Sequence, residues 1–372
     1  MKLNIAVLSG DGIGPEVTHQ AIKVLKAIAQ EFDHSFRFKE APVGAIAIDQ
    51  TGNPLPDDTL QLCEASDAIL FGAIGDPKYD NNPSAKVRPE QGLLKLRKSL
   101  GLYANIRPVK AYETLLDKSP LKEHIIKGTD ISIYRELTGG IYFGKKQLSE
   151  DGNVASDLCE YSREEIERIA HLAFKAAQSR KKKVTLVDKA NVLETSRLWR
   201  KVVTKLAKDY PDVELDFLFV DNAAMQMILN PKQFDVILTE NLFGDVISDE
   251  ASVIGGSIGL LASASVGDKH AMFEPIHGSY PQATGKGIAN PIASILSAAM
   301  LLEHFGLYKE ANVIKAGVEK SLQLHVTTPD LNDNFDHITT SKVGDFIEDF
   351  IHNPKDSNLN FTNIHIGQST II

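Results

Sequence analysis

Short apolar runs alternate with stretches of helical periodicity along this chain. The apolar run 5–8 is followed by an amphipathic stretch over 17–28, and a second apolar run, 68–71, comes after a proline-rich turn. Further strand-like runs lie at 130–135, 184–187, 215–220 and 236–239. Short strands that alternate with helices are typical of α/β proteins with crossover helices. The pattern therefore predicts an α/β fold.

One region has a different texture. Residues 138–144 and 153–157 are extended and rich in small residues, with turn-forming residues over 150–153, so we expect a hairpin-like excursion there. The last stretch, 356–372, is expected to form a final strand or a tail. With 372 residues, the chain exceeds the usual size of one domain, which favours two domains or one enlarged sheet.

Composition narrows the classes of partner. A hydrophobic content of 43% with 24% charged residues is ordinary for a globular protein. The net charge of -9 argues against nucleic acid and against an anionic membrane surface. The richest apolar segment, 292–305, is too short for a membrane span and contains Glu303 and His304. The basic run 180–183 is expected to be a solvated helix end.

Cysteine usage points to a reducing compartment. Cys63 and Cys159 give neither a disulfide framework nor the ligand spacing of a zinc site. The N-terminus enters directly into a predicted strand, so we expect no signal peptide. Together with the cysteine usage, this leads us to expect a protein of the reducing cytoplasm.

The acidic stretch 241–250 follows the apolar run 235–238. Asp245 and Asp249 are four residues apart, so both carboxylates project from one face of a helix. Two like charges with no Lys or Arg between them are unfavourable unless a cation lies beside them, and oxygen ligands suit Mg2+ or Mn2+. The alternative interpretation is a solvated acidic face of a helix.

The glycine-rich segment 9–16 follows a predicted strand and opens a helix. Its glycines have the spacing G-x-G-x-G followed by Pro15, which does not match the dinucleotide fingerprint G-x-G-x-x-G, and no acidic residue at the end of a predicted strand appears at the distance that the fingerprint requires. The segment therefore predicts a tight strand-to-helix turn, with the proline in the first helical turn.

A second glycine-rich stretch covers 274–291. Its glycines let backbone amides approach a ligand, Lys286 could meet a phosphate, and His277 and Asn290 offer groups to a base. A helix that begins after Pro291 would add its dipole. A cofactor site and an ordinary connecting loop both remain open for this stretch.

Three arginines suit a dicarboxylate substrate if they converge, because guanidinium groups bind carboxylates in a bidentate way. These are Arg97, Arg107 and Arg135; each alone could equally be a surface or ion-pair residue. Tyr142 and Lys189 are similarly ambiguous. A lysine directly after an apolar strand can be a base with a lowered pKa or a structural cation.

Together these segments resemble the β-decarboxylating dehydrogenases, the family of isocitrate and isopropylmalate dehydrogenases. The resemblance runs from residue 5 to about residue 350 and is carried in order by 10–16, 96–98, 105–108, 135–142, 188–191, 220–223, 241–250 and 277–291. It implies a two-domain α/β fold with a large mixed central sheet and no Rossmann domain. A nucleotide-binding domain would comprise 1–103 with 256–372. The substrate, metal and dimerisation domain would be 104–255, with a hairpin arm near 138–158.

The resemblance also implies roles for individual residues. The substrate carboxylates would bind Arg97, Arg107 and Arg135, and Mg2+ or Mn2+ would bind Asp221, Asp245 and Asp249. Tyr142 and Lys189 would be the catalytic acid and base, aided by Asp221, with Lys189 and Asp221 reaching the site from the partner subunit of a homodimer. NAD would be bound by Asn191, Glu274, His277, Gly278, Ser279, Gln282, Gly285 and Asn290.

The implied reaction is an oxidation at C2 of a malate, followed by loss of the C3 carboxylate as carbon dioxide. Glu90, Leu93 and Leu94 are expected to contact the substrate. Leucines stand here where isocitrate dehydrogenases have a polar segment, so an isopropyl group fits better than a third carboxylate. This favours 3-isopropylmalate and a place in leucine biosynthesis, although leucines packed into a helix core would give the same pattern.

Several other functions are compatible with the same residues. Relatives that act on tartrate, malate or homoisocitrate are alternatives, as are a non-catalytic paralogue and a metal-dependent phosphohydrolase built on the aspartates. The presence of Tyr142 and Lys189 argues against the last two. One departure from the isopropylmalate enzymes is Gln282, which replaces an Asp that binds the adenosine ribose and makes discrimination between NAD and NADP less strict.

Overall fold

The computed structural model describes residues 1–80, 82, 85–331 and 338–353, and these divide into two compact units. Unit 1 comprises residues 1–100 and the described residues from 256 onward, and unit 2 comprises residues 101–255. The assignment of 1–103 with 256–372 to nucleotide binding, and of 104–255 to substrate, metal and dimerisation, stays a prediction. The segment 356–372, for which a strand or tail is expected, lies outside the described residues.

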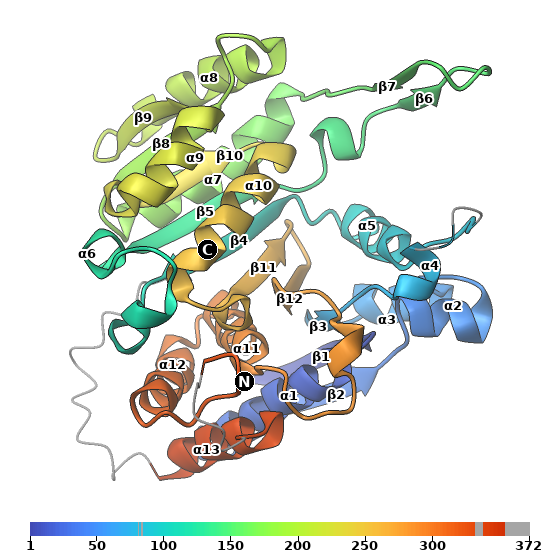
Figure 1. Ribbon diagram of the computed structural model, residues 1–372, viewed down its shortest axis with the longest axis vertical. Coiled ribbons are helices and arrows are strands. Elements are labelled where there is room, and N and C mark those ends of the chain that lie inside the picture. The colour runs from blue at the N-terminus through green and yellow to red at the C-terminus, as the bar shows by residue number, and fades with distance from the viewer. Residues whose placement is uncertain (81, 83–84, 332–337, 354–372) are drawn as a thin grey trace. The chain divides into compact units, whose positions relative to one another are not determined.

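Unit 1 contains five strands in the order β2-β1-β3-β12-β11 (Figure 1). Pairing is parallel from β2 to β12, and β11 runs antiparallel to β12. The strands are β1 (Lys2–Gly10), β2 (Ser35–Glu40), β3 (Ala68–Ala73), β11 (Ala262–Val266) and β12 (Ala271–Pro275). Its helices are α1 (Gly14–Glu31), α2 (Ala45–Thr51), α3 (Asp57–Glu64), α4 (Pro77–Asp80), α5 (Pro89–Ser99), α11 (Ile292–His304), α12 (Tyr308–Gln323) and α13 (Thr340–His352).

Unit 2 also contains five strands, in the order β4-β5-β10-β8-β9. Only β4 and β5 are antiparallel among these neighbours. The strands are β4 (Ala104–Lys110), β5 (Asp130–Glu136), β8 (Lys183–Asp188), β9 (Glu214–Phe219) and β10 (Val236–Thr239). The helices are α6 (Glu123–Ile126), α7 (Arg163–Gln178), α8 (Glu194–Leu206), α9 (Val220–Leu229) and α10 (Asn241–Ser252).

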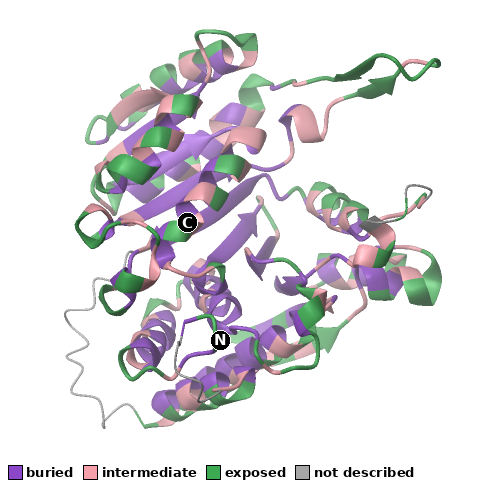
Figure 2. Cartoon of the chain, in the orientation of Figure 1, coloured by how far each residue is buried: buried purple, intermediate pink, exposed green. Residues whose placement is uncertain are grey.

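The expected mixed α/β architecture is confirmed in both units. The strands of 68–71, 130–135, 184–187 and 236–239 are all present, and the strand expected at 215–220 ends at Phe219 because Val220 already begins α9. The central strands are mostly buried, whereas the edge strands β2 and β9 are exposed or half-buried (Figure 2). The near-continuous apolar character of the central strands follows from burial on both faces.

The turn between β1 and α1 is the tight connection that the glycine spacing predicts. Pro15 lies in the first turn of α1, where its missing N–H costs no hydrogen bond. α11 begins at Ile292, directly after Pro291, as expected. α7 begins with a capping box in which the Ser162 hydroxyl accepts from the Glu165 N–H and the Glu165 carboxylate accepts from the Ser162 N–H.

The expected excursion is a two-stranded antiparallel hairpin of β6 (Lys146–Leu148) and β7 (Ala155–Asp157). All six strand residues are exposed, and the hairpin extends away from the rest of unit 2 (Figures 1 and 2). Strands this short bury too little surface to be stable alone.

Within the described ranges, none of the helices combines the length and apolar character needed to cross a membrane.

The prediction for the basic run 180–183 is partly wrong. Arg180 is a buried side chain that donates to the Asp130 carboxylate at 2.7 Å and to the Asp235 carboxylate at 2.8 Å. These aspartates lie at the start of β5 and just before β10, so a cation is needed between them. Lys181 and Lys182 are exposed, as expected.

Candidate active site

Helix α10 presents Asp245 and Asp249 one turn apart in unit 2. The opposite side of the helix inserts Ile247 and Ala251 into a buried apolar cluster with Ile133 and Ile237 from the strands beneath. Burial of that face leaves the two carboxylates on the accessible side, with 32% and 66% of the Asp245 and Asp249 side chains exposed. The predicted placement of both aspartates on one helical face is confirmed.

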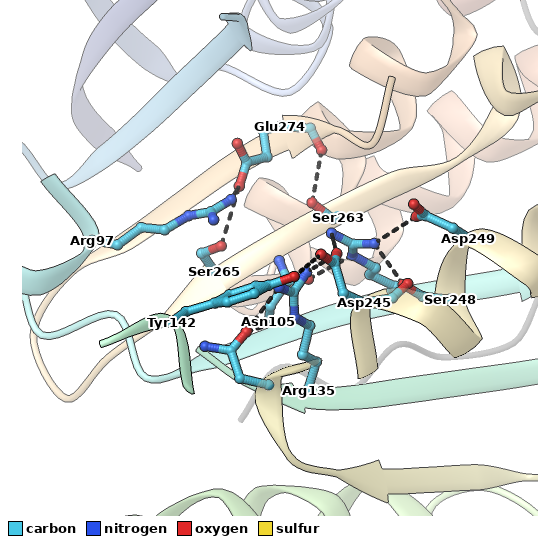
Figure 3. A network of polar contacts seen from close by, with 12 residues as sticks. Arg97, Asn105, Arg135, Tyr142, Asp245, Ser248, Asp249, Ser263, Ser265 and Glu274 are labelled. Carbon is cyan, nitrogen blue, oxygen red and sulfur yellow. Dashed lines mark hydrogen bonds and ion pairs between the residues drawn. The ribbon is translucent and has the colours of Figure 1, made fainter. Parts of the chain in front are cut away.

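Arg135, at the end of β5, lies beneath Asp245. Its Nη1 donates to Asp245 Oδ1, and its Nε and Nη2 donate to Asn241 Oδ1 at 3.0 and 2.8 Å (Figure 3). The stem of this arginine passes against Gly244, where a Cβ atom would lie 2.6 Å from Arg135 Cγ. The glycine therefore provides the room that lets a buried guanidinium reach the first turns of α10.

Arg107, on β4, contacts both aspartates. Its Nη1 donates to Asp249 Oδ1 at 3.2 Å and to Ser248 Oγ at 2.5 Å, and its Nη2 lies 3.6 Å from Asp245 Oδ1. Its Nε donates to Asn105 Oδ1 at 2.7 Å. Charge-assisted bonds of this kind hold the two buried guanidinium groups in fixed orientations.

The pairing of β4 with β5 explains why the two arginines meet at α10. Asn105 lies directly opposite Arg135, and Arg107 lies two residues further along β4, opposite Ile133. Residues two apart on a strand project from the same face of a sheet. Both guanidinium groups therefore reach the same helix, which replaces the repulsion expected between Asp245 and Asp249 by a network of compensated charges.

Tyr142 completes this group from the 3-10 turn Gly140–Tyr142. Its hydroxyl donates to Asp245 Oδ2 at 2.8 Å, and its ring lies 5.7 Å from the guanidinium carbon of Arg135. Burial, and secondarily the hydrogen bond to Asp245, raise the pKa of the Tyr142 phenol above its usual value. The hydroxyl is thus protonated at neutral pH and can act as a proton donor.

Lys189 and Asp221 form a second charged pair of unit 2. Lys189, just after β8, donates to Asp221 Oδ2 at 2.7 Å, in the first turn of α9. This hydrogen bond lowers the pKa of the Asp221 carboxyl. Asp221 is 68% exposed, and Asn191 close by in the sequence is exposed as well. The pair is open to solvent on the surface of the single chain.

The expected three-aspartate metal site is not assembled within one chain. Among the described residues, no group of three or more His, Cys, Asp or Glu side chains is placed to hold a metal ion. Asp245 and Asp249 offer accessible oxygen donors next to each other, which fits part of the coordination shell of Mg2+ or Mn2+. Asp221, engaged with Lys189, would have to come from another copy of the chain.

In unit 1, Arg97 projects from α5 to a buried acid. Its Nη2 donates to Glu274 Oε1 at 2.8 Å, and Ser265 Oγ donates to the same oxygen at 3.2 Å (Figure 3). The Arg97 Nε is buried and has no hydrogen-bond partner. Arg107 and Arg135 converge, as predicted, on one cluster; the convergence of Arg97 with them stays a prediction.

The other candidates on α5 have different surroundings. Leu96 and Gly92 form its buried face, whereas Leu93 is half-buried and Leu94 exposed. Leu94 is thus not packed into a helix core, and the alternative interpretation given for the two leucines does not hold for this residue. Glu90 is half-buried; a Cβ atom on Gly75 would lie 3.2 Å from its Oε1.

The glycine-rich loop after β12 also belongs to unit 1. His277 Nδ1 lies 3.0 Å from the Gly278 carbonyl, a contact that needs a proton on Nδ1, and the buried Nε2 has no partner. Burial lowers the pKa of His277, so the ring is neutral and presents an acceptor at Nε2. Asn290 Oδ1 accepts from the Ile292 N–H at 3.0 Å, at the start of α11. Ser279 is buried, whereas Gly278, Gln282 and Gly285 are exposed.

Several polar partners in the cluster are not among the sequence-predicted residues. Asn105, Asn241 and Ser248 are buried and each contacts an arginine. Asn241 is the first residue of the acidic stretch 241–250 and Ser248 lies within it, so a polar residue on the buried side of that helix is the signal that could have identified them. Asn105 offers no such signal, because its role depends on the pairing of β4 with β5.

The fold and the cluster define an α/β enzyme with a charged site, and the comparison with known families specifies it. Residues 4–347 match the family model described as isocitrate/isopropylmalate dehydrogenase. The chain belongs to this family, whose members are oxidoreductases.

Similar proteins cover nearly the whole chain. It is 52% identical to a 3-isopropylmalate dehydrogenase of Bacteroides fragilis, over 94% of this chain and 99% of the relative. It is 54% identical to that of Priestia megaterium, over 95% and 97%. A crystal structure of isocitrate dehydrogenase from Methylococcus capsulatus aligns with a TM-score of 0.84 at 35% identity, covering 94% of this chain and 99% of that one.

Proposed function

We propose that this protein oxidises 3-isopropylmalate with NAD and releases carbon dioxide, giving 4-methyl-2-oxopentanoate, a step of leucine biosynthesis. The cluster of Arg107, Arg135, Tyr142 and Asp245 carries the proposal. Beside helix α10 it brings together two guanidinium groups that can bind carboxylates, a phenol that can donate a proton, and a carboxylate that can bind a cation. Support comes from the relatives named 3-isopropylmalate dehydrogenase, which are 52% and 54% identical to this chain over nearly its full length. A half-buried and an exposed leucine on α5 suit an isopropyl group.

The arginines would exchange partners when substrate binds. In the single chain they contact Asp245 and Asp249, both of which are accessible. A substrate carboxylate can take one guanidinium edge while the aspartates turn to a divalent cation. That cation, held by Asp245, Asp249 and Asp221 of the partner subunit, would supply electrophilic stabilisation of negative charge on substrate oxygen.

The chain's own residues would move the two protons. Lys189 of the partner subunit would take the proton of the C2 hydroxyl. NAD, when bound, would supply the acceptor for the C2 hydrogen as hydride, so the product would be a β-keto acid. The bond from C3 to its carboxylate then breaks, releasing carbon dioxide and leaving the electron pair on the remaining carbon–oxygen framework. Tyr142 supplies the proton that C3 needs, in agreement with the raised pKa of its phenol.

A homodimer follows from this assignment. Lys189 pairs with Asp221, whereas Asp245 and Asp249 of α10 pair with Arg107 and Arg135, so one chain does not bring the two groups together through these contacts. The described part of unit 2 exposes apolar side chains on α9, on α10 and in the hairpin region, namely Met225, Ile228, Leu229, Val246, Leu148, Val154 and Leu158. A soluble monomer rarely exposes so many apolar side chains on neighbouring elements. We expect a dimer by light scattering after gel filtration, and a monomer that turns over at the full rate would exclude shared sites.

The test of the function is NADH formation with 3-isopropylmalate, isocitrate, tartrate and malate, each with Mg2+ or Mn2+ and after exhaustive chelation. We expect 3-isopropylmalate to give the highest kcat/KM with NAD and chelation to abolish turnover. A higher kcat/KM with isocitrate or tartrate would replace the proposed substrate. Phosphate release from phosphomonoesters without NADH formation would favour a hydrolase instead.

A further inference from the structure

The first glycine-rich segment, 10–16, has no part in the site described so far. Asp11 is buried there and accepts the backbone N–H groups of Ala45, Ile46 and Gly75 at 2.9, 3.0 and 2.9 Å. Gly12 has φ +60°, and a Cβ atom on it would lie 2.0 Å from the Ser279 carbonyl oxygen. The segment is therefore fixed in place and lies in direct contact with the second glycine-rich loop.

Glu16, in the first turn of α1, contacts that loop through both carboxylate oxygens. Its Oε1 accepts the N–H of Gly285, and its Oε2 accepts the N–H of Gly287 at 3.2 Å. The two glycines have φ +73° and +64°, in the left-handed region, and no atom approaches their Cβ positions closer than 3.9 Å. Glycine is thus needed here for its conformation and not for lack of space.

The remainder of the loop is seated on the same elements. Ile13, just before α1, and Val17 in its first turns form a buried apolar cluster with Ala283 and Ala289 of the loop. The Ile13 N–H also donates to the Ser279 carbonyl at 2.8 Å. To these contacts Glu16 adds two hydrogen bonds, which fix Gly285 and Gly287 on either side of Lys286.

A third element holds the far side of the loop. The Thr340 N–H at the start of α13 donates to the Gly287 carbonyl at 2.8 Å, and the Thr340 hydroxyl donates to the Ala289 carbonyl at 2.6 Å. Gly287 is therefore held through its N–H by Glu16 and through its carbonyl by Thr340. Gly285, which is exposed, has Glu16 as its anchor.

We propose that Glu16 is a positioning residue for the dinucleotide: it holds Gly285 and Gly287 in their left-handed conformations before the cofactor binds and thereby sets cofactor affinity. The inference rests on the proposed function in one respect, that NAD binds at this loop. A loop that is ordered in advance loses less conformational entropy on binding than a free one. Because Glu16 contacts the loop and not the malate site, its effect falls on cofactor binding and not on the chemical step.

The experiment compares Glu16→Ala and Glu16→Gln with the unmodified protein. Alanine removes both acceptors, whereas glutamine keeps the shape and one acceptor oxygen. Glu40→Gln is the matched control, since Glu40 is an exposed glutamate on the edge strand β2 of the same unit. Three quantities are measured: the Kd for NADH by fluorescence in the absence of substrate, the steady-state constants, and hydrogen exchange of the 278–290 segment in the free protein.

We expect the Kd for NADH and the KM for NAD to rise about tenfold in Glu16→Ala and about threefold in Glu16→Gln. Hydrogen exchange of the loop should accelerate in the same order, while kcat and the KM for 3-isopropylmalate change by less than about twofold. Glu40→Gln should match the unmodified protein. Glutamine preserves the packing, so it keeps the comparison informative if the alanine variant does not fold.

The inference is wrong if loop exchange accelerates with no change in cofactor affinity, or if kcat and both KM values change together. It is also wrong if the unmodified protein does not bind NADH. Binding of NADH without turnover of 3-isopropylmalate would refute the proposed substrate alone and leave the role of Glu16 standing.

Discussion

The charged cluster of unit 2 and the glycine-rich loop of unit 1 are ordered by different means. In the cluster, side chains hold side chains: Arg107 and Arg135 compensate Asp245 and Asp249, and Tyr142 donates to Asp245. In the loop, a carboxylate holds backbone N–H groups in conformations that only glycine adopts easily. The first arrangement is sensitive to any change of charge, and the second to any change of backbone freedom.

This difference predicts how the two regions respond to substitution. If the cluster acts on the reacting atoms, as proposed, a change in it should lower kcat. A change in the loop alters the cost of ordering the backbone, so it alters affinity by a smaller factor. Substitutions in both regions can therefore be ranked by expected effect.

The largest effect is expected for Asp245→Asn. The amide cannot replace a carboxylate that takes hydrogen bonds from both Arg135 and Tyr142 and is proposed to bind a divalent cation, so kcat should fall about a thousandfold or more. The protein should stay folded, because Arg135 keeps Asn241 and Arg107 keeps Asn105 and Ser248. Circular dichroism and kcat are the measurements, with Asp268→Asn in an exposed loop as the control. Turnover close to that of the control would show that Asp245 is not a metal ligand.

A smaller effect is expected for Leu93→Ala on α5. Burying the isopropyl group against Leu93 and Leu94 should contribute roughly 2 to 3 kcal/mol, a factor of about 30 to 160 in favour of 3-isopropylmalate over malate. Removing one leucine should narrow that preference without changing the rate with malate. The ratio of the two kcat/KM values measures it, with exposed Leu324→Ala as the control. An unchanged ratio would mean that the leucine serves packing alone.

Glu240→Gln tests a buried charge of unit 2 at the start of helix α10. Burial, with a contribution from the charge of Glu136, raises the pKa of Glu240 from 4.5 to about 7. A carboxyl with a raised folded-state pKa stabilises the fold fully below pH 4.5 and loses that contribution as the pH rises through 7. Glutamine should therefore raise the free energy of unfolding at pH 8 by about 3 kcal/mol and have little effect at pH 4.5.

Urea unfolding of Glu240→Gln and of Glu40→Gln at the two pH values checks this prediction. Equal stability of Glu240→Gln and the unmodified protein at pH 8 would mean that the buried carboxylate finds compensation. Its Oε2 is buried and has no hydrogen-bond partner, which argues against that outcome.

The smallest effect is expected for Gln282→Asp in the loop. A carboxylate there would repel the 2'-phosphate of NADP, whereas the neutral amide does not. Because the residue is exposed, the preference for NAD should widen by only about fivefold. The ratio of kcat/KM for NAD and NADP measures it, with Gln282→Asn as a neutral control. A preference for NADP in the unmodified protein would refute the cofactor assignment.

Local patterns were enough to predict much of this molecule. The four-residue spacing of Asp245 and Asp249 determines their common face on a helix, and the spacing in 9–16 excludes the dinucleotide fingerprint. Contacts between distant segments were beyond such patterns. The meeting of Arg107 with Asp249 depends on the register of β4 and β5, and the two hydrogen bonds of Glu16 depend on glycines about 270 residues away. The burial of Arg180 was missed for the same reason.

Gly244 has a consequence for the sequences that this position can accept. Any other residue would place a methyl or larger group within 2.6 Å of the Arg135 stem, and the guanidinium would have to leave Asn241 and Asp245 together. A saturation library at position 244 should therefore return glycine alone under selection for turnover, although alanine is the better helix former. Glycine lowers the helix propensity at this one residue of α10, and the space that it leaves lets Arg135 of strand β5 reach the helix.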